Sequence, residues 1–546
     1  MDYFDLGHYS RVITTTSPSA QLWFDRGLIW VYAYNHEEAI TCFQKALKDD
    51  PECAMAYWGI AYAIGPNYNK PWAAFENAEK PDVVAMAQDA IATVTNLKDK
   101  GTPIEKALIE AISYRYPKDP EVEDFAPWND AYADAMRQVY RTHSSDLDVC
   151  CLFAEALMNR TPWQLWDLPS GQPAPGASTL EALTVLETAF AQLAGAWEHP
   201  GLLHMYIHLI EMSPHPERAR RHGDRLSTLV PDAGHLLHMA THIDVLCGDY
   251  PNVVSRNHIA TQADKKFLAR VGPHNFYSVY RFHNYHFTIY GAMFLGQPSV
   301  ALATADELMA ALPEEILRPM ADWFESFFPM KQHALIRFGL WEEILAQPLP
   351  EDADLYCVTM AMIRYARTVA LANLGRHNEA AAERDHFDEA FQRVPETRML
   401  FNNTCRDILT VAEQMMLGEL EYHKGNYEQA FAHLRRSVEL DDNLPYDEPW
   451  GWMQPTRHAL GALLLEQGHY DEAEAIYRAD LGLDTTLSRA CQHPGNVWSL
   501  HGLHECLMHR GETVEAAHIK LQLDQAIARA EVPIRASCYC RHRSVA

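Results

Sequence analysis

The chain has 546 residues, of which 48% are hydrophobic and 22% charged, and its formal net charge is -28. Such an acidic chain is unsuited to nucleic acid or an anionic membrane surface, because binding either one requires lysine and arginine to neutralise phosphates. No stretch approaches the ~20 apolar residues of a membrane-spanning helix, and the first residues show no basic region followed by an apolar core. We therefore expect neither nucleic acid nor membrane as a partner.

Eleven cysteines are present without a regular framework, which favours buried thiols in a reducing compartment over disulfides. This pattern predicts a cytoplasmic protein. Cys538 and Cys540, with His542 nearby, form one cluster that resembles half of a zinc site. Because the second half is missing, we interpret these residues as a reduced tail rather than a metal site.

The first elements in chain order are two antiparallel helices within residues 18–66, joined by a turn at Asn35 and His36. A second copy of the pattern begins at Ala54. The landmark residues of the first copy are Trp23, Gly27 and Trp30, then Ala39, Phe43 and Ala46, closed by Pro51. Their spacing resembles the consensus of the tetratricopeptide repeat family. That resemblance implies an all-α, right-handed α-solenoid of helix-turn-helix repeats.

The same interpretation extends along residues 1–546 as a single solenoid, because each repeat needs to pack only on its neighbours. The expected segments are N-terminal repeats at 18–66, divergent helices at 67–198, histidine-rich repeats at 199–300, divergent repeats at 301–400, C-terminal repeats at 401–530 and an irregular tail at 531–546.

Histidines recur at one helical register in the segment 199–300. His204, His208 and Glu211 are spaced i, i+4 and i+7, which places them on one face of a helix. A step of 34 residues leads from His204 to His238 and from His208 to His242, and 34 residues is the length of one tetratricopeptide repeat. The remaining members of the pattern are His235, His283, His286 and Tyr290. The last three match the register if about 14 extra residues, near Lys265 to His274, are allowed.

The family resemblance also implies that the first helix of each repeat lines a concave groove. Seven of the nine groove positions in these three repeats are histidine, far more than 28 histidines in 546 residues would place there by chance. Histidines four residues apart on a helix lie ~6 Å apart at Cβ and can chelate one ion. The sequence therefore predicts a metal centre built from His204, His208, His235, His238, His242, His283 and His286.

Neutral imidazoles suit copper, iron, zinc or nickel, whereas the near absence of carboxylates argues against magnesium and calcium. Glu211 is expected to act as a ligand, a partner of a ligand or a general base. Glu211 and Tyr290 are the candidate catalytic residues. We expect copper or iron as the cofactor, with zinc as the alternative metal.

The leading functional hypothesis is an oxidase or oxygenase that acts on a small organic molecule, including aromatic ones. One alternative is a zinc hydrolase with Glu211 as its base. Another is a non-enzymatic adaptor with a protein or peptide partner in the groove. Two long connections, Pro162 to Gly176 and Lys265 to His274, are not needed by an adaptor and favour a closed chamber.

Overall fold

The computed structural model describes residues 3–119 and 121–541, and α-helices make up most of them. Its chain divides into two compact units. Unit 1 comprises Met1–Ile243 and Ile259–Arg281, and unit 2 comprises Asp244–His258 and Phe282–Ala546. None of the described helices is long and apolar enough to cross a membrane. That the chain stacks as one continuous solenoid stays a prediction.

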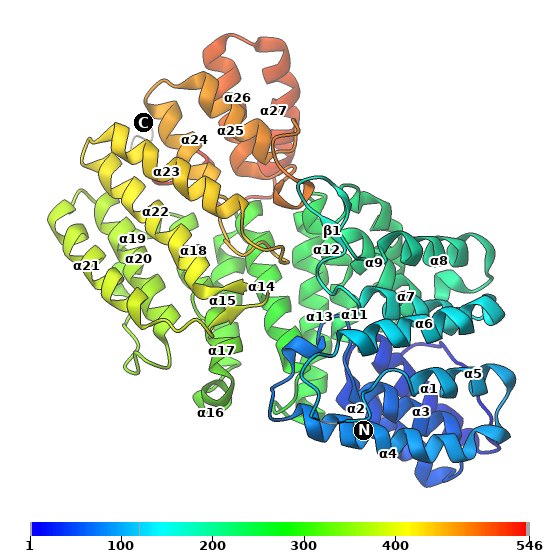
Figure 1. Cartoon of the computed structure of the whole chain (residues 1–546). Coiled ribbons are helices and arrows are strands. Elements are labelled where there is room, and N and C mark those ends of the chain that lie inside the picture. The colour runs from blue at the N-terminus through cyan, green and yellow to red at the C-terminus, as the bar shows by residue number, and fades with distance from the viewer. Residues whose placement is uncertain (1–2, 120, 542–546) are drawn as a thin grey trace. The chain divides into compact units, whose positions relative to one another are not determined.

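Unit 1 is a succession of antiparallel helix pairs (Figure 1). Its helices are α1 (Pro18–Tyr32), α2 (His36–Asp49), α3 (Ala54–Ile64), α4 (Lys80–Leu97), α5 (Pro103–Ile112), α6 (Ala126–His143), α7 (Leu147–Met158), α8 (Thr179–Gln192), α9 (Pro200–Glu211), α10 (Arg220–Leu226) and α11 (Gly234–His238). Short 3-10 turns occur at η1 (Trp72–Ala74), η2 (Lys98–Lys100), η3 (Ala196–Glu198) and η4 (Pro216–Ala219). A two-stranded antiparallel ribbon joins β1 (Trp166–Asp167) to β2 (Gln172–Pro173).

Several helices of unit 1 begin with a side chain that accepts one of the first free N–H groups of the helix. Ser17 caps α1, which has Pro18 in its first turn, and Asn35 caps α2. Thr102 and Glu105 form a complete capping box at α5.

Close packing of the first three helices depends on glycine. A Cβ on Gly27 of α1 would lie 2.5 Å from the Phe43 ring on α2, and one on Gly59 of α3 would lie 2.6 Å from the same ring. Phe43 is fully buried between them. The small residues therefore let the large one fill the space between helices, as the repeat pattern predicts.

The boundary between the units falls inside three helices, α12 (Ala240–Leu246), α13 (Tyr250–Val271) and α14 (Ser278–Leu295). Here the structure corrects one expectation. Most of the extra residues from Lys265 to His274 do not form a long connection but lengthen α13 to 22 residues. A continuous helix satisfies its own backbone hydrogen bonds, which a long loop cannot do.

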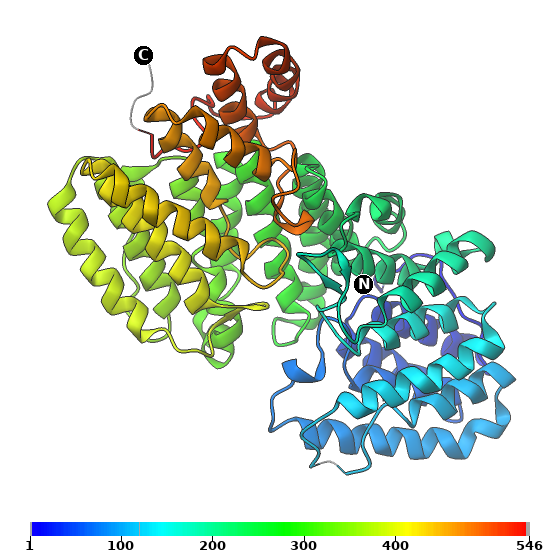
Figure 2. The ribbon, with the colours of Figure 1, turned by 45° about the horizontal axis from the view of Figure 1, so that its top comes forward.

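Unit 2 contains the helices α15 (Pro298–Ala310), α16 (Glu314–Leu317), α17 (Ala321–Phe324), α18 (Met330–Arg337), α19 (Trp341–Ala346), α20 (Cys357–Asn373), α21 (His377–Arg393), α22 (Cys405–His423), α23 (Tyr427–Asp442), α24 (Thr456–Glu466), α25 (Tyr470–Asp480), α26 (Val497–Arg510) and α27 (Thr513–Ile527). Its short elements are η5 (Arg318–Met320), η6 (Glu325–Phe327), η7 (Arg489–Cys491), β3 (Met399–Leu400) and β4 (Asn403–Thr404). The pairs α20–α21 and α22–α23 lie side by side in both views (Figures 1 and 2).

The tail corrects a second expectation. Cys538 and Cys540 are joined by a disulfide, with their Cα atoms 5.3 Å apart, instead of being reduced. That separation lies within the range that a disulfide spans. Both cysteines are buried against unit 2. The described part of the tail is irregular, as predicted, and His542 to Ala546 lie outside the described residues.

Candidate metal centre

The helix α9 carries the first pair of predicted ligands, His204 and His208. The side chain of His199 caps this helix by accepting the Leu202 N–H at 3.0 Å. Gly201 sits in its first turn, where a Cβ would lie 2.6 Å from the Cys151 sulfur. The small residue therefore lets α9 lie close to its neighbours, and all residues of α9 are buried.

The next histidines lie on α11 and α12, two short helices interrupted at Met239. His235 and His238 belong to α11 and His242 to α12, and each side chain is at most 1% exposed. Despite this interruption, His238 and His242 still lie on the same side of the two helices, with their ring centres 4.7 Å apart.

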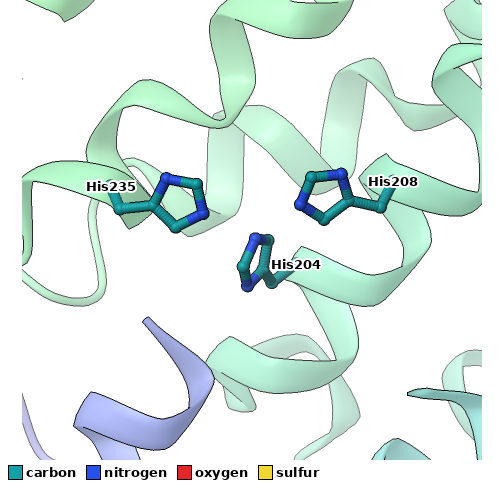
Figure 3. A group of neighbouring side chains, drawn as sticks. All are labelled: His204, His208 and His235. Atoms are coloured by element: carbon teal, nitrogen blue, oxygen red, sulfur yellow. The ribbon is translucent and has the colours of Figure 1, made fainter. Parts of the chain in front are cut away.

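Three of the predicted ligands converge, and we call His204, His208 and His235 the histidine trio. Each offers one ring nitrogen, and these three nitrogens lie within 4.8 Å of one another. Figure 3 shows the three rings turned toward a shared space. All three side chains are 0% exposed. The trio is therefore a buried set of three nitrogen donors contributed by α9 and α11.

Hydrogen bonds on the far side of two rings fix their tautomers. His204 Nδ1 lies 2.6 Å from the Tyr32 carbonyl oxygen, and His208 Nδ1 lies 2.8 Å from Oε1 of Glu211. Since both oxygens can only accept, both Nδ1 atoms carry the proton. The Nε2 lone pairs of His204 and His208 have no hydrogen-bond partner among the described residues, and neither ring nitrogen of His235 has one.

Glu211 joins α9 to α12 by holding two histidines. Its second oxygen, Oε2, accepts a hydrogen bond from His242 Nδ1 at 2.7 Å. His242 Nε2 in turn lies 2.8 Å from His238 Nε2. Ligand atoms around a tetrahedral zinc-sized ion would be about 3.3 Å apart, given bonds of ~2.0 Å. The shorter contacts at Glu211 and His238 are at hydrogen-bond distance and orient the rings. His208, Glu211 and His242 also offer ligand atoms that lie within 4.8 Å of one another, so the predicted ligand roles of His238 and His242 stay predictions.

Burial keeps these imidazoles neutral. It lowers the pKa of His204 to about 3, because the charged form would lose its hydration. Burial likewise holds the pKa of His208 and His235 well below the ordinary value, with a smaller contribution from the neighbouring histidines. Neutral imidazole is the form that binds a metal ion.

Aromatic rings surround the trio. The Tyr34 ring centre lies 4.6 Å from that of His204, 5.9 Å from His208 and 5.7 Å from His235. The Tyr280 ring lies 4.1 Å from His235 on another side. These rings exclude water from the shared space, which strengthens electrostatic interactions there.

The predicted loop from Pro162 to Gly176 covers the same centre. Its Trp163 ring lies 5.8 Å from the ring of His208, and the Trp163 N–H donates to Tyr68 Oη at 3.2 Å. The Tyr68 ring itself lies 4.9 Å from His208. Trp166, in β1, anchors the loop by donating to the Leu209 carbonyl at 2.6 Å. The loop therefore closes over α9.

Backbone strain marks these aromatic positions. Three non-glycine residues among those described have a positive φ, namely Tyr34 at 55°, Trp163 at 59° and Phe401 at 48°. Such a conformation is costly for large side chains, and strain of this kind concentrates at functional sites. Tyr34 and Trp163 both contact His208, and in unit 2 Phe401 lies 4.8 Å from His283. In each case the strained residue places a ring against a predicted ligand.

A cavity of about 180 Å³ lies beside the centre in unit 1. Tyr34 and Tyr277 line it, and both also contact the centre. Tyr34 packs on the trio, while Tyr277 Oη accepts the His235 N–H at 3.0 Å. The cavity and the trio therefore share two walls.

Two segments of the chain match a family model described as the tetratricopeptide repeat, residues 20–53 and residues 409–479. The chain therefore contains tetratricopeptide repeats (TPR) in these two segments. Both matches fall on helix pairs of the structure, α1–α2 and α22–α25. The predicted fold class, an all-α, right-handed α-solenoid of TPR-like repeats, is confirmed.

Among solved structures, this chain is similar to human IFIT1, in a dimer with m7Gppp-AAAA, at 12% identity and a TM-score of 0.33. That match covers 91% of this chain and 95% of the other. A second match is yeast Tom70, at 11% identity and a TM-score of 0.26, covering 93% and 90% of the two chains. No curated protein matches this sequence.

The remaining predicted site residues belong to unit 2. His283 is buried, and its ring also lies 4.9 Å from Phe287. His286 Nε2 lies 2.8 Å from the Met453 sulfur. For these two histidines the role of metal ligand stays a prediction.

Tyr290, the second candidate catalytic residue, takes part in a buried hydrogen-bond network of unit 2. Its hydroxyl lies 3.0 Å from His493 Nε2, and His493 Nδ1 donates to Asp480 at 2.8 Å. His458 and Ser499 donate to the same carboxylate. The network ties α14 to α24, α25 and α26, so Tyr290 has a structural role in unit 2, and its catalytic role stays a prediction.

Sequence reasoning did not identify three of the aromatic residues that enclose the trio, Tyr34, Tyr68 and Tyr280. It also interpreted Asn35 and His36 as turn residues, whereas Asn35 caps α2, His36 begins it and both line the cavity. The sequence feature that could have indicated this enclosure is Trp163, a large aromatic residue in a loop rich in proline and glycine.

Proposed function

We propose that unit 1 binds one first-row transition-metal ion, copper or iron, on His204, His208 and His235. The observation that supports this most is the convergence of three buried ring nitrogens that have no hydrogen-bond partner within residues 3–119 and 121–541. An unsatisfied buried polar atom costs about 1–3 kcal/mol. A metal ion would satisfy one nitrogen of each ring and remove most of that cost.

The donor set favours this class of metal. Three neutral imidazoles suit copper, iron, zinc and nickel, while magnesium and calcium prefer oxygen. Three protein ligands also leave a coordination position open, which is typical of catalytic rather than structural sites. The enclosing aromatic rings and the adjoining cavity support a reaction on a small molecule.

We propose an oxidase or oxygenase activity for this centre. The bound metal would supply electron transfer between the substrate and dioxygen. In the oxidase form, the substrate loses two electrons and two protons, and dioxygen gains them to become hydrogen peroxide. The protein's own residues would exclude water, through Tyr34 and Tyr280, and orient the ligands, through Glu211.

Glu211 is better suited to positioning than to general-base catalysis. Both of its oxygens accept hydrogen bonds from histidine Nδ1 atoms, those of His208 and His242. A base in a zinc hydrolase needs an oxygen directed at the attacking water. This geometry favours the redox proposal over hydrolysis.

A second candidate function is that of an adaptor, and the two repeat matches at residues 20–53 and 409–479 favour it. Repeat solenoids commonly provide extended surfaces for binding partners. The match in unit 2 would place a peptide partner on the helices α22 to α25. Such a surface is compatible with a metal centre in unit 1.

The decisive experiment is elemental analysis of the purified protein and of its His208→Ala/His235→Ala variant. The matched control is His222→Phe, because His222 is also buried in unit 1 but stacks on Tyr206 at 4.0 Å, away from the trio. Near-stoichiometric copper or iron, lost only in the double variant, is the expected result. Zinc would redirect the search to hydrolysis, and no metal after reconstitution would leave the adaptor function.

A further inference from the structure

The disulfide between Cys538 and Cys540 lies beside a buried carboxyl group of unit 2. An oxygen of Glu419, on α22, is within 4.8 Å of both sulfur atoms. Glu419 is 1% exposed, Cys538 8% and Cys540 0%. Because the sulfurs are bonded to each other, neither is a thiolate, which is the form of cysteine that binds a metal ion. The cluster is therefore a disulfide beside a carboxylic acid rather than a metal site.

The neighbouring residue Ser537 holds the tail in this place. Its hydroxyl donates to the His458 carbonyl oxygen at 2.8 Å and lies 2.6 Å from Tyr477 Oη. Its own carbonyl oxygen accepts a hydrogen bond from Arg337 at 2.5 Å. None of these contacts involves a sulfur atom. They therefore keep the tail beside Glu419 whether or not the two sulfurs are bonded.

Glu419 carries a proton at or below neutral pH. Burial raises its pKa to about 7, because the charged form would lose its hydration. Two smaller effects lower it, a hydrogen bond of 3.1 Å from the Asn373 amide and the positive charge of Arg337. The carboxyl group therefore gives up or takes up a proton near pH 7.

A small cavity of about 10 Å³ borders the disulfide at Cys538. The titratable side chains that line it, besides Cys538, are Glu419, Arg337, Tyr365 and His458. Burial raises the pKa of the Tyr365 hydroxyl well above its ordinary value of 10. Burial lowers the pKa of Arg337, but only to about 10. Both groups therefore keep their protons at neutral pH.

His458 does not supply a proton either. Its Nδ1 lies 2.8 Å from a terminal nitrogen of Arg337 and must accept from it, and its Nε2 donates to Asp480 at 3.0 Å. Burial lowers the pKa of His458 to about 4, so the ring is neutral. Among the described residues around this cavity, Glu419 is therefore the group that can release a proton near pH 7.

Opening the disulfide creates a need for that proton. When a thiolate attacks one sulfur of a disulfide, the other sulfur leaves with the electron pair of the bond. A thiolate on Cys540, which is fully buried, would have lost its hydration and would be a poor leaving group. Transfer of a carboxyl proton to this sulfur as the bond breaks removes the charge.

We propose that Cys538 and Cys540 form a redox-active disulfide that exchanges with a dithiol, with Glu419 as the proton donor. A thiolate of the dithiol attacks Cys538 Sγ, the more exposed sulfur, and forms a mixed disulfide. Cys540 Sγ leaves with the electron pair of the broken bond and takes the proton of Glu419.

The second thiol of the dithiol completes the exchange. It loses its proton and attacks the mixed disulfide, which releases Cys538, and solvent returns one proton to Cys538 and one to Glu419. In total, two electrons and two protons pass from the dithiol to the cysteines, and the dithiol becomes a cyclic disulfide. The reaction takes place within unit 2 and needs no metal ion in unit 1.

The test measures how fast dithiothreitol reduces the oxidised full-length protein between pH 6 and pH 8. Free thiols are alkylated at each time point, and mass spectrometry quantifies the peptide that contains Cys538 and Cys540. Each rate is divided by the concentration of dithiothreitol thiolate at that pH. This corrected rate should fall about tenfold from pH 6 to pH 8, because Glu419 loses its proton near pH 7.

Glu419→Gln keeps the size of the side chain and an oxygen for Asn373 but removes the proton donor. At pH 6 its corrected rate should be lower than that of the native protein by about tenfold or more, and it should not change with pH. The matched control is Glu325→Gln. Glu325 is another buried carboxyl group of unit 2 with a pKa of about 7, but it accepts hydrogen bonds from Thr359. This variant should react at the native rate.

A corrected rate of the native protein that is the same at pH 6 and pH 8 would overturn the proposal, and this result does not depend on any variant. So would an equal rate in folded Glu419→Gln, or a native protein in which mild oxidation does not join Cys538 to Cys540. An equal loss of rate in Glu325→Gln would assign the effect to the fold of unit 2 instead of to the proton of Glu419.

Discussion

Glu211, the last residue of α9, lies 2.7 Å from Nδ1 of His242, a histidine that follows it by 31 residues. The same carboxylate holds His208 at 2.8 Å. One side chain therefore sets the ring orientation of histidines from two successive repeats.

Replacing Glu211 with Gln should weaken metal binding by about 10- to 100-fold, because an amide cannot accept from both Nδ1–H groups at once. The affinity is measured by competition with a chelator. Glu187→Gln is the control, since Glu187 is a half-exposed carboxylate of unit 1 that pairs with Arg218 and Tyr206. An unchanged affinity in Glu211→Gln would contradict the positioning role.

Tyr34→Gly should release metal faster and should also be less stable than the native protein. Glycine adopts a φ of 55° without strain, but this offsets only about 1 kcal/mol of the roughly 3–5 kcal/mol that is lost with a buried aromatic ring. Loss of the ring opens the trio to water, so we expect metal to transfer to a chelator faster. Tyr34→Phe keeps the ring and should release metal at the native rate. Equal release rates from all three proteins would exclude this shielding role.

Acid should destabilise the fold between pH 6.5 and about 4 through its buried neutral histidines. Burial lowers the pKa of His222 to about 4, below the 6.5 of an unfolded chain. In this window the unfolded chain binds a proton that the folded protein does not, so the free energy of unfolding falls as the pH falls.

His222→Phe removes the side chain that binds this proton. The free energy of unfolding should therefore fall by about 2 kcal/mol less between pH 7 and pH 5 than it does in the native protein. Urea unfolding at the two pH values measures the difference. His386→Asn serves as the control, because the His386 side chain is half exposed on α21. A loss as large in His222→Phe as in the native protein would contradict the prediction.

Cys538→Ser/Cys540→Ser should leave the metal content of the protein unchanged, because these residues lie in unit 2 and are joined to each other. The measurement is elemental analysis beside the native protein. Loss of metal in this variant, with helicity retained, would place ligands in the tail instead of on α9 and α11.

The sequence was sufficient to predict the helix pairs and to include His204, His208 and His235 among seven candidate ligands, but it favoured His238 and His242 as the partners of His204 and His208. Gly27 and Phe43 carry packing information that is local to one repeat, and the step from His204 to His238 repeats a length that the fold itself imposes. Because α9 and α11 occupy equivalent places in successive repeats, His208 and His235 were expected on one face.

The enclosure of the trio could not be predicted in the same way. Tyr34 reaches it through a backbone conformation that tyrosine rarely adopts. Tyr68 and Trp163 come from connections whose paths depend on tertiary contacts rather than on periodicity. The pairing of Cys538 with Cys540 depends likewise on how the tail folds back on unit 2.

Glu211 also has a consequence for how the protein unfolds. Repeat proteins can open one repeat at a time, since each packs only on its neighbours. Here the Glu211 carboxylate links α9 to α12 through its hydrogen bonds with His208 and His242. An ion bound to the trio would link α9 to α11 as well. Residues 200–246 would then open together, and amide hydrogen exchange along these helices would occur in one cooperative step.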